Sequence, residues 1–388
     1  MVNELYSAIG QPLVNSHQFY KYGKTKYMRP IIFPIIAIFS SPVNSNATVV
    51  DSWSPHVYNA IKWTAANQDQ QTIAYTTSQG ITRVPIAYHG GVDWDESGDI
   101  TAHDIERFSR WAKLNLPTDY CGPVLLDYER PWWKELGARS ITHDRLQEIM
   151  NVYIQGINVA QGLSPTAQWG YWGLPLLRNT GKKWQEQQLT MEPLISQCSA
   201  LFPDVYDGNR DGDSSNLAER HISKVLEFAK GRMPVYVFVS IRYTGQGGDH
   251  SYFIPHDVFL KQANAAMKAV WVDALGVQHK IQGLILWDSY GFSPESEWAD
   301  LDQKHKYYFE LLNALTQAWK KESNAVLIET GLSPVGRCQY ALPEPANSAT
   351  TLDQSTQKLV EEEQTRVLPD MQSGPVGSGR IRGNRIKE

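Results

Sequence analysis

The hydrophobic pattern along the chain predicts strands and helices that alternate about seven times. The strand-like runs are apolar throughout, which indicates strands that are buried on both faces. The expected strands cover residues 31–39, 72–76, 84–88, 124–126, 168–172, 200–206, 235–241 and 284–287. The expected helices cover residues 55–67, 101–114, 144–161, 214–230, 257–274 and 300–320. This order predicts an α/β fold, specifically a TIM-like (β/α) barrel of about seven to eight parallel strands in a single domain.

The alternation occupies residues 29–330, which we assign to the barrel domain. Residues 1–28 form a polar N-terminal leader, and residues 341–388 have few apolar residues and no periodicity, so we expect a disordered tail. Residues 28–41 also resemble part of a signal peptide, but an opening strand at 31–39 accounts for them as well and is preferred. No apolar run is long enough to span a membrane. The residues alone leave the compartment undecided.

Composition excludes some partners and favours others. The 388 residues carry a formal net charge of −5, so no global basic field attracts nucleic acid. The 13 Trp and 19 Tyr provide many flat faces that suit sugar rings. The three cysteines, Cys121, Cys198 and Cys338, lack metal-binding spacing and cannot all pair within one chain, although one disulfide is possible.

Two carboxylates, Asp127 and Glu129, directly follow the short apolar run 124–126. Residues two apart on a strand project from the same face, with Cα atoms roughly 7 Å apart. Two acids in such a place are costly to ionise together, so one should keep its proton near neutral pH. Paired carboxylates are typical of glycoside hydrolysis. The alternative is a surface pair at a fraying strand end, each acid paired with a cation such as Arg130.

Several aromatic residues share this position at the ends of expected strands. Catalytic groups of (β/α) barrels lie at the carboxyl ends of the strands. Tyr171, Trp172, Tyr206 and Trp287 all lie at or just past such ends. This coincidence favours the catalytic interpretation of the two acids.

Six short segments also occur in an order that matches a known family. They are Thr72-Ile73-Ala74-Tyr75, Gly90-Gly91-Val92, Asp127-Tyr128-Glu129 with Arg130-Pro131, Trp169 to Pro175, Ala200 to Tyr206, and Gly283 to Trp287. Together they resemble the hyaluronidase family of glycoside hydrolases, over about residues 31–320.

The resemblance implies retaining hydrolysis of N-acetylhexosaminidic bonds in a glycosaminoglycan such as hyaluronan or chondroitin, assisted by the substrate's acetamido group. It implies that Glu129 is the general acid/base and that Asp127 orients and stabilises the acetamido group. Tyr206 would hydrogen-bond that group, and Trp287 would form the wall behind its methyl. The further substrate-binding residues would be Tyr75, Tyr171 and Trp172. The partner would be the polysaccharide, no cofactor would be required, and the family suggests secretion.

The sequence departs from the family pattern at several points. Trp172 stands where the family usually has Tyr, and Arg130-Pro131 follows the acids two residues early. The family's cysteines and Cys-rich C-terminal module are absent. The alternative function is therefore a non-catalytic carbohydrate-binding barrel derived from such an enzyme.

A twelve-residue acidic stretch, 93–104, matches an EF-hand-type calcium loop at most positions, with Gly98 at the sharp turn. Its oxygen ligands would be Asp93, Asp95, Ser97, Asp99 and Asp104. The alternative is an acidic turn in which Thr101 caps the following helix, with Asp104 as its capping-box partner. A structural Ca²⁺ is thus a second expectation.

Overall fold

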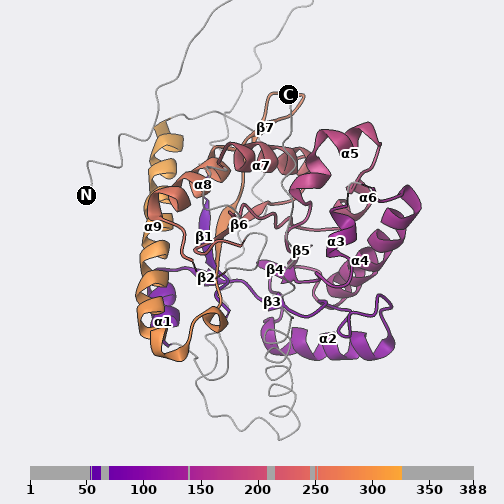
Figure 1. Cartoon of the computed structure of the whole chain (residues 1–388), viewed down its shortest axis with the longest axis horizontal. Coiled ribbons are helices and arrows are strands. Elements are labelled where there is room, and N and C mark those ends of the chain that lie inside the picture. Colours follow the sequence, from indigo (N-terminus) through magenta and orange to yellow (C-terminus); the bar gives the residue numbers. More distant parts are fainter. Residues whose placement is uncertain are drawn as a thin grey trace, which may run out of the picture. The chain divides into compact units, whose positions relative to one another are not determined.

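A computed structural model describes residues 53, 55–62, 70–138, 140–207, 215–244, 250 and 252–325 (Figure 1). The expected strand at 31–39, the leader at 1–28 and the tail at 341–388 lie outside the described residues.

The strands of the two larger sheets pair in parallel. In one sheet, β9 (Gly283–Trp287) lies between β1 (His56–Asn59) and β6 (Tyr236–Ser240), and β1 pairs in turn with β2 (Thr82–Arg83). In a second sheet, β4 (Pro123–Leu126) lies between β3 (Ile86–Ala87) and β5 (Gln168–Tyr171). The predicted α/β fold with parallel strands is therefore confirmed.

Short connections link the two sheets along both of their edges. On one side, β2 and β3 are separated only by Val84 and Pro85, and the Val84 N–H donates to the Asn59 carbonyl at 2.9 Å. On the other side, isolated parallel bridges join Trp172 to Phe202 and Asp204 to Phe238. The expected strand at 200–206 is thus reduced to such bridges.

The two faces of these strands pack into different clusters. One face contributes to a small cluster of buried residues: Ala60, Val84, Leu125, Ala200, Phe202, Tyr236, Phe238 and Ile285. We call this the inner cluster. The alternate residues, such as Val124, Leu126, Val237 and Leu284, belong to the larger core that also contains the apolar faces of the helices. Burial on both faces explains why the strands lack polar alternation.

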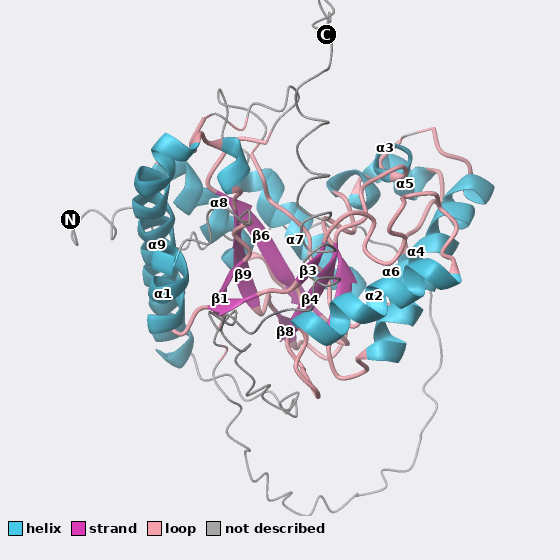
Figure 2. Ribbon diagram, turned by 90° about the horizontal axis from the view of Figure 1, so that it is seen from below, coloured by secondary structure: helices cyan, strands magenta, loops and turns pink. Residues whose placement is uncertain are grey.

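Five long helices match the expected ones within a few residues, except that α8 ends six residues early. They are α2 (Ala102–Asn115), α4 (His143–Leu163), α7 (Ser215–Ala229), α8 (His256–Lys268) and α9 (Trp298–Ala325). Figure 2 shows the strands in the middle of these helices. Helix α8 gives way to a hairpin of β7 (Trp271–Val272) and β8 (Gln278–His279). The short helices α3 (Trp133–Leu136), α5 (Lys182–Glu186) and α6 (Glu192–Ile195) were not expected.

Two sequence-based predictions near the start of the described chain are wrong. The expected helix at 55–67 begins instead with strand β1. The expected strand at 72–76 lies in helix α1 (Gln70–Ser78), which packs beside α9. The β-branched threonines favour a strand by propensity, but Thr72 and Thr76 share a buried helix face. The Thr76 hydroxyl donates to the Thr72 carbonyl at 2.9 Å, so tertiary packing overrides propensity.

Two further features bear on the sequence analysis. Within the described ranges, no helix is both long and apolar enough to cross a membrane. Cys121 is disulfide-bonded, and Cys198 is a buried free thiol.

We predict that Gly170→Ala destabilises the protein by about 1–3 kcal/mol, because overpacking strains a close-packed core. A Cβ added at Gly170 would lie 2.2 Å from the Ala200 carbonyl oxygen and 2.9 Å from the Phe202 ring. The matched control is Gly162→Ala in helix α4, where a Cβ would meet nothing within 4 Å. Urea unfolding should show the control unchanged or stabilised by up to about 1 kcal/mol. Equal stability of the two variants would contradict the packing described for β5.

Candidate active site

The backbone extends the inward face of β4 to Asp127. Leu125 belongs to the inner cluster, and residues two apart on an extended chain share a face. The Asp127 N–H donates to the Ala87 carbonyl at 2.9 Å, so pairing continues one residue past the strand. Asp127 is half-buried, whereas Glu129 is exposed. The first acid therefore extends the inner cluster, and the second lies where solvent reaches it.

Aromatic rings from several segments form a row beside these acids. Trp172, Tyr206 and Trp287 all pack against the inner cluster. Ring centroids lie 4.9 Å apart for Trp133 and Trp172, 5.9 Å for Trp172 and Tyr206, and 5.6 Å for Tyr206 and Trp287. Phe292 continues the row, 5.7 Å from Trp287. The structure thus brings together three of the aromatic residues expected at the site and adds Trp133 and Phe292.

Two expected substrate-binding residues do not join this row. Tyr171 is buried in the larger core, where its hydroxyl donates to the Tyr153 carbonyl at 2.8 Å. Alternation along β5 sends its side chain toward the helices and that of Trp172 toward the inner cluster. Tyr75 lies on helix α1, with the Lys306 Nζ of α9 at 5.5 Å from its ring centroid. Tyr171 thus lies at the end of β5 as expected but faces the larger core, and Tyr75 lies on a helix instead of a strand, so neither side chain is in the row beside the acids.

Burial sets the electrostatics of Asp127. Loss of solvation raises its pKa to about 6, the charge of Lys62 opposes the rise, and the charge of Glu96 adds to it. At neutral pH the Asp127 carboxyl is therefore mainly ionised.

Glu129 is shifted further in the same direction. Loss of solvation raises the pKa of Glu129 to about 8, and the negative charges of Asp127 and Asp204 add to this rise. Glu96 adds a smaller rise and Arg130 opposes it. The side chain also reaches solvent, which screens part of these effects. Glu129 consequently tends to keep its proton at pH values where Asp127 has lost its own.

Two buried polar atoms beside the row lack hydrogen-bond partners among the described residues. They are Asp127 Oδ1 and the Tyr206 hydroxyl. The Trp172 side chain approaches that hydroxyl closely enough to limit the rise in the Tyr206 pKa, but it does not reach hydrogen-bond geometry. Buried polar groups are normally paired, so these two atoms can serve a bound molecule.

Sequence reasoning missed two charged residues of this site. Asp204 lies two residues before Tyr206 on the same segment, so the two-residue periodicity of that segment could have indicated it. Burial raises the pKa of Asp204 to about 6. Lys62 follows β1, which the sequence predicts as helix, so no signal in the pattern pointed to it.

A hydrogen-bond network fixes the backbone between the two acids. The Tyr128 hydroxyl donates to Asp93 Oδ2 and accepts from Trp132 Nε1 at 2.9 Å. The Tyr128 carbonyl accepts from the Tyr153 hydroxyl at 2.6 Å. Because Tyr128 is held at both ends, the residues on either side of it are also positioned.

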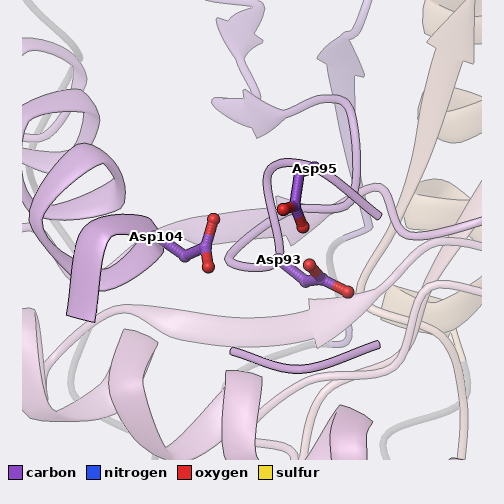
Figure 3. A group of neighbouring side chains, drawn as sticks. All are labelled: Asp93, Asp95 and Asp104. Atoms are coloured by element: carbon purple, nitrogen blue, oxygen red, sulfur yellow. The ribbon is translucent and has the colours of Figure 1, made fainter. Parts of the chain in front are cut away.

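Three of the five predicted calcium ligands come together at this network. Asp93, Asp95 and Asp104 each place one carboxylate oxygen within 4.8 Å of the others (Figure 3). Asp99 is not part of this group. The Ser97 hydroxyl lies 3.3 Å from the Asp99 carbonyl oxygen and 3.4 Å from Asp93 Oδ1, so it can donate its one proton to either.

The carboxylates of this cluster already have protein partners. Asp93 Oδ2 accepts the Gly98 N–H at 2.7 Å as well as the Tyr128 hydroxyl. Asp104 forms the expected capping box with Thr101 at the start of α2. Ca²⁺ requires six to eight oxygen ligands, so the residues present fit it only in part. The hydrogen bonds support the acidic turn more fully, and calcium at this loop stays a prediction.

Comparisons with known proteins give weak likenesses. No protein-family model matches the chain, and no curated protein does either. A structure of bee venom hyaluronidase has 17% identity and a TM-score of 0.44, over 68% of this chain and 99% of that one. Bee venom hyaluronidase in complex with a hyaluronic acid tetramer has 16% identity and a TM-score of 0.45, over 68% and 99%. An endo-beta-1,4-mannanase from Thermotoga petrophila has 10% identity and a TM-score of 0.36, over 61% and 60%. At these values the likenesses establish neither a shared fold nor a shared activity.

We predict that a cation held by the acidic loop raises the melting temperature of the wild-type protein when Ca²⁺ is added, because only the folded state assembles its ligands. The rise should vanish in Asp95→Asn, which keeps the acceptor for the Ser97 N–H and removes the charge. Differential scanning calorimetry with Ca²⁺ and with EDTA makes the comparison. An unchanged wild-type melting temperature would assign the loop to hydrogen bonds alone.

Proposed function

We propose that this chain is a retaining glycoside hydrolase that cleaves N-acetylhexosaminidic bonds with the help of the substrate's own acetamido group. The supporting observation is the pair of acids at the end of β4. Loss of solvation raises the pKa of Asp127 to about 6 and, together with the charges of Asp127 and Asp204, that of Glu129 to about 8. The two acids therefore carry different protonation states between these values. A neutral acid beside an ionised one is what this chemistry requires.

In the first step, Glu129 donates its proton to the glycosidic oxygen as the bond from that oxygen to the anomeric carbon breaks. The acetamido carbonyl oxygen forms the new bond to the anomeric carbon from the opposite face. Asp127 accepts a hydrogen bond from the acetamido N–H and stabilises the positive charge that develops on this group. The leaving sugar departs as an alcohol, and Glu129 is left as a carboxylate.

In the second step, the Glu129 carboxylate takes a proton from water, whose oxygen attacks the anomeric carbon. The bond to the acetamido oxygen breaks, and the configuration at the anomeric carbon is retained. The nucleophile belongs to the substrate, so the chain needs no further carboxylate for that role. The reaction requires no cofactor.

The aromatic row would bind the sugar ring at the reacting centre. The Tyr206 hydroxyl, buried without a partner among the described residues, would donate to the acetamido oxygen. Trp287, stacked against Tyr206 at 25°, would close the pocket behind the acetamido methyl. Trp172, stacked on Trp133, offers a flat apolar face for a sugar ring in place of a hydroxyl.

The strand contacts support one closed barrel as the frame of this site. Pairing and bridges lead from β6 through β9, β1 and the segment of β2 and β3 to β4 and β5. Bridges at Phe202 and Asp204 then return from β5 to β6. We infer a ring of seven parallel segments, with the inner cluster as its filling and the acids at its carboxyl ends.

The substrate we propose is a glycosaminoglycan such as hyaluronan or chondroitin, following the resemblance of the strand-end motifs to the hyaluronidase family. Secretion would bring the protein to such polymers.

The second candidate is a carbohydrate-binding protein that has lost catalysis, and Trp172 favours it because an indole cannot replace a tyrosine hydroxyl. An oligosaccharide that stays bound and uncut over days would identify the binding protein.

We predict that Glu129→Gln lowers kcat by about 10²–10⁴-fold, the usual contribution of a general acid/base, while substrate binding persists. The wild-type rate should be bell-shaped in pH, rising as Asp127 ionises near 6 and falling as Glu129 loses its proton near 8. These limbs belong to the interacting pair. Release of reducing ends from hyaluronan and chondroitin measures the rate. Glu186→Gln, an exposed carboxylate of α5, is the control, and a near-wild-type rate in Glu129→Gln would refute the mechanism.

We predict that Tyr206→Phe lowers kcat about tenfold or more without lowering the free energy of unfolding, because its hydroxyl has no partner among the described residues. Tyr171→Phe is the matched control. It loses the hydrogen bond to the Tyr153 carbonyl, so it should lose about 1 kcal/mol of stability and keep its kcat. The reverse pattern in the two variants would show that Tyr206 is structural.

A further inference from the structure

The proposed reaction requires that the proton reside on Glu129 and the charge on Asp127. Loss of solvation alone does not divide them in this way, because it raises the pKa of both acids. Two groups closely spaced in an enclosed site interact strongly and share their protons. The division therefore depends on which charges surround each acid.

Lys62 is fixed on the side of Asp127. Its N–H donates to the Asp288 carbonyl at 2.8 Å, and its own carbonyl accepts the Tyr290 N–H at 3.0 Å. The Lys62 ammonium lies 4.1 Å from the centroid of the Tyr88 ring. Tyr88 directly follows Ala87, whose carbonyl accepts the Asp127 N–H. Lys62 and Asp127 thus lie beside the same tyrosine, past the ends of β1 and β4, the strands on the two sides of the β2–β3 segment.

Asp204 is fixed on the side of Glu129. Its Oδ1 accepts the Tyr206 N–H at 3.2 Å, which holds the side chain over its own segment. A Cβ at Gly173 would lie 3.4 Å from Asp204 Oδ2 and 2.4 Å from the Trp133 ring, so carboxylate and ring are neighbours. The Trp133 N–H donates to the Glu129 carbonyl at 2.8 Å. Asp204 therefore lies beside the turn that carries Glu129.

We propose that Lys62 and Asp204 are positioning residues that divide the protonation states of the site, Lys62 holding Asp127 as the anion and Asp204 holding Glu129 as the acid. This inference rests on the proposed function and extends it to two residues to which the resemblance to the hyaluronidase family assigns no role. Asp204 raises the pKa of Glu129, and Lys62 lowers that of Asp127.

The other ionisable groups near Asp127 and Glu129 do not move the pKa values of the two acids apart in this direction. Glu96 acts in the same direction on both acids, so it shifts them together. Arg130 opposes the proton on Glu129. The pKa values of the phenols of Tyr88 and Tyr206 are raised by burial, so both stay neutral over the working range. The charge of Asp127 itself adds to the rise in the Glu129 pKa, and Lys62 and Asp204 are the further charged groups that move the pKa values of the two acids apart.

The test compares pH–rate profiles on hyaluronan and chondroitin. Lys62→Met should move the acid limb up by about one pH unit, because Asp127 loses the nearby cation, and Lys62→Arg should restore it. Asp204→Asn, which retains the acceptor for Tyr206, should move the alkaline limb down by about one unit, because Glu129 loses a repelling charge. Lys280→Met, near the opposite end of β9, and the exposed Asp257→Asn are the matched controls and should move neither limb. Unmoved limbs in Lys62→Met and Asp204→Asn would overturn the proposal.

A titration of the side-chain carboxyls separates this proposal from the proposed function. ¹³C NMR of protein labelled at the Asp and Glu carboxyls follows both acids without substrate, with Asp127→Asn and Glu129→Gln assigning the signals. The expected result is a rise of the Asp127 midpoint in Lys62→Met and a fall of the Glu129 midpoint in Asp204→Asn. If no polymer is cleaved but these shifts occur, the division of charge stands and the hydrolase assignment fails. If polymers are cleaved and the midpoints do not move, the division of charge fails alone.

Discussion

The placement of two carboxyls directly after a buried strand is the constraint on which the site depends. Val124, Leu125 and Leu126 are at most 1% exposed, and the chain leaves this environment directly into Asp127. A charge placed there loses solvation, and a second acid two residues later adds repulsion. The fold tolerates the pair because Lys62 offsets part of the charge and because Glu129 reaches solvent. The same arrangement would supply the acid and the anion that the proposed glycoside hydrolysis needs.

The surrounding hydrogen bonds keep this pair of mutually repelling acids in place. Tyr128 is anchored through its hydroxyl to Asp93 and through its carbonyl to Tyr153 of helix α4. The acidic loop 93–104 is therefore connected to the residue between the two acids, whether or not a cation binds there. Residues far apart in the sequence form one support for the turn that carries the two acids.

The sequence predicted the parts of the fold where periodicity and burial agree. The strands β4, β6 and β9 were recognisable because they are continuous apolar runs, and helix α2 because Thr101 and Asp104 cap it. Helix α1 was missed because its threonines favour a strand in isolation and are buried against α9 only after folding. For the site, Asp127, Glu129, Trp172, Tyr206 and Trp287 followed from their positions at strand ends. Lys62 and the inward or outward direction of Tyr171 depend on tertiary contacts that a pattern does not contain.

The most direct test of the account is the configuration of the sugar first released by the wild-type protein. ¹H NMR of the anomeric protons during early cleavage of a hyaluronan or chondroitin oligosaccharide distinguishes the two anomers before they equilibrate. Assistance by the acetamido group, with Glu129 acting first as acid and then as base, predicts release of the anomer with the same configuration as the bond that is cut. Release of the inverted anomer would contradict the assigned roles of Asp127 and Glu129.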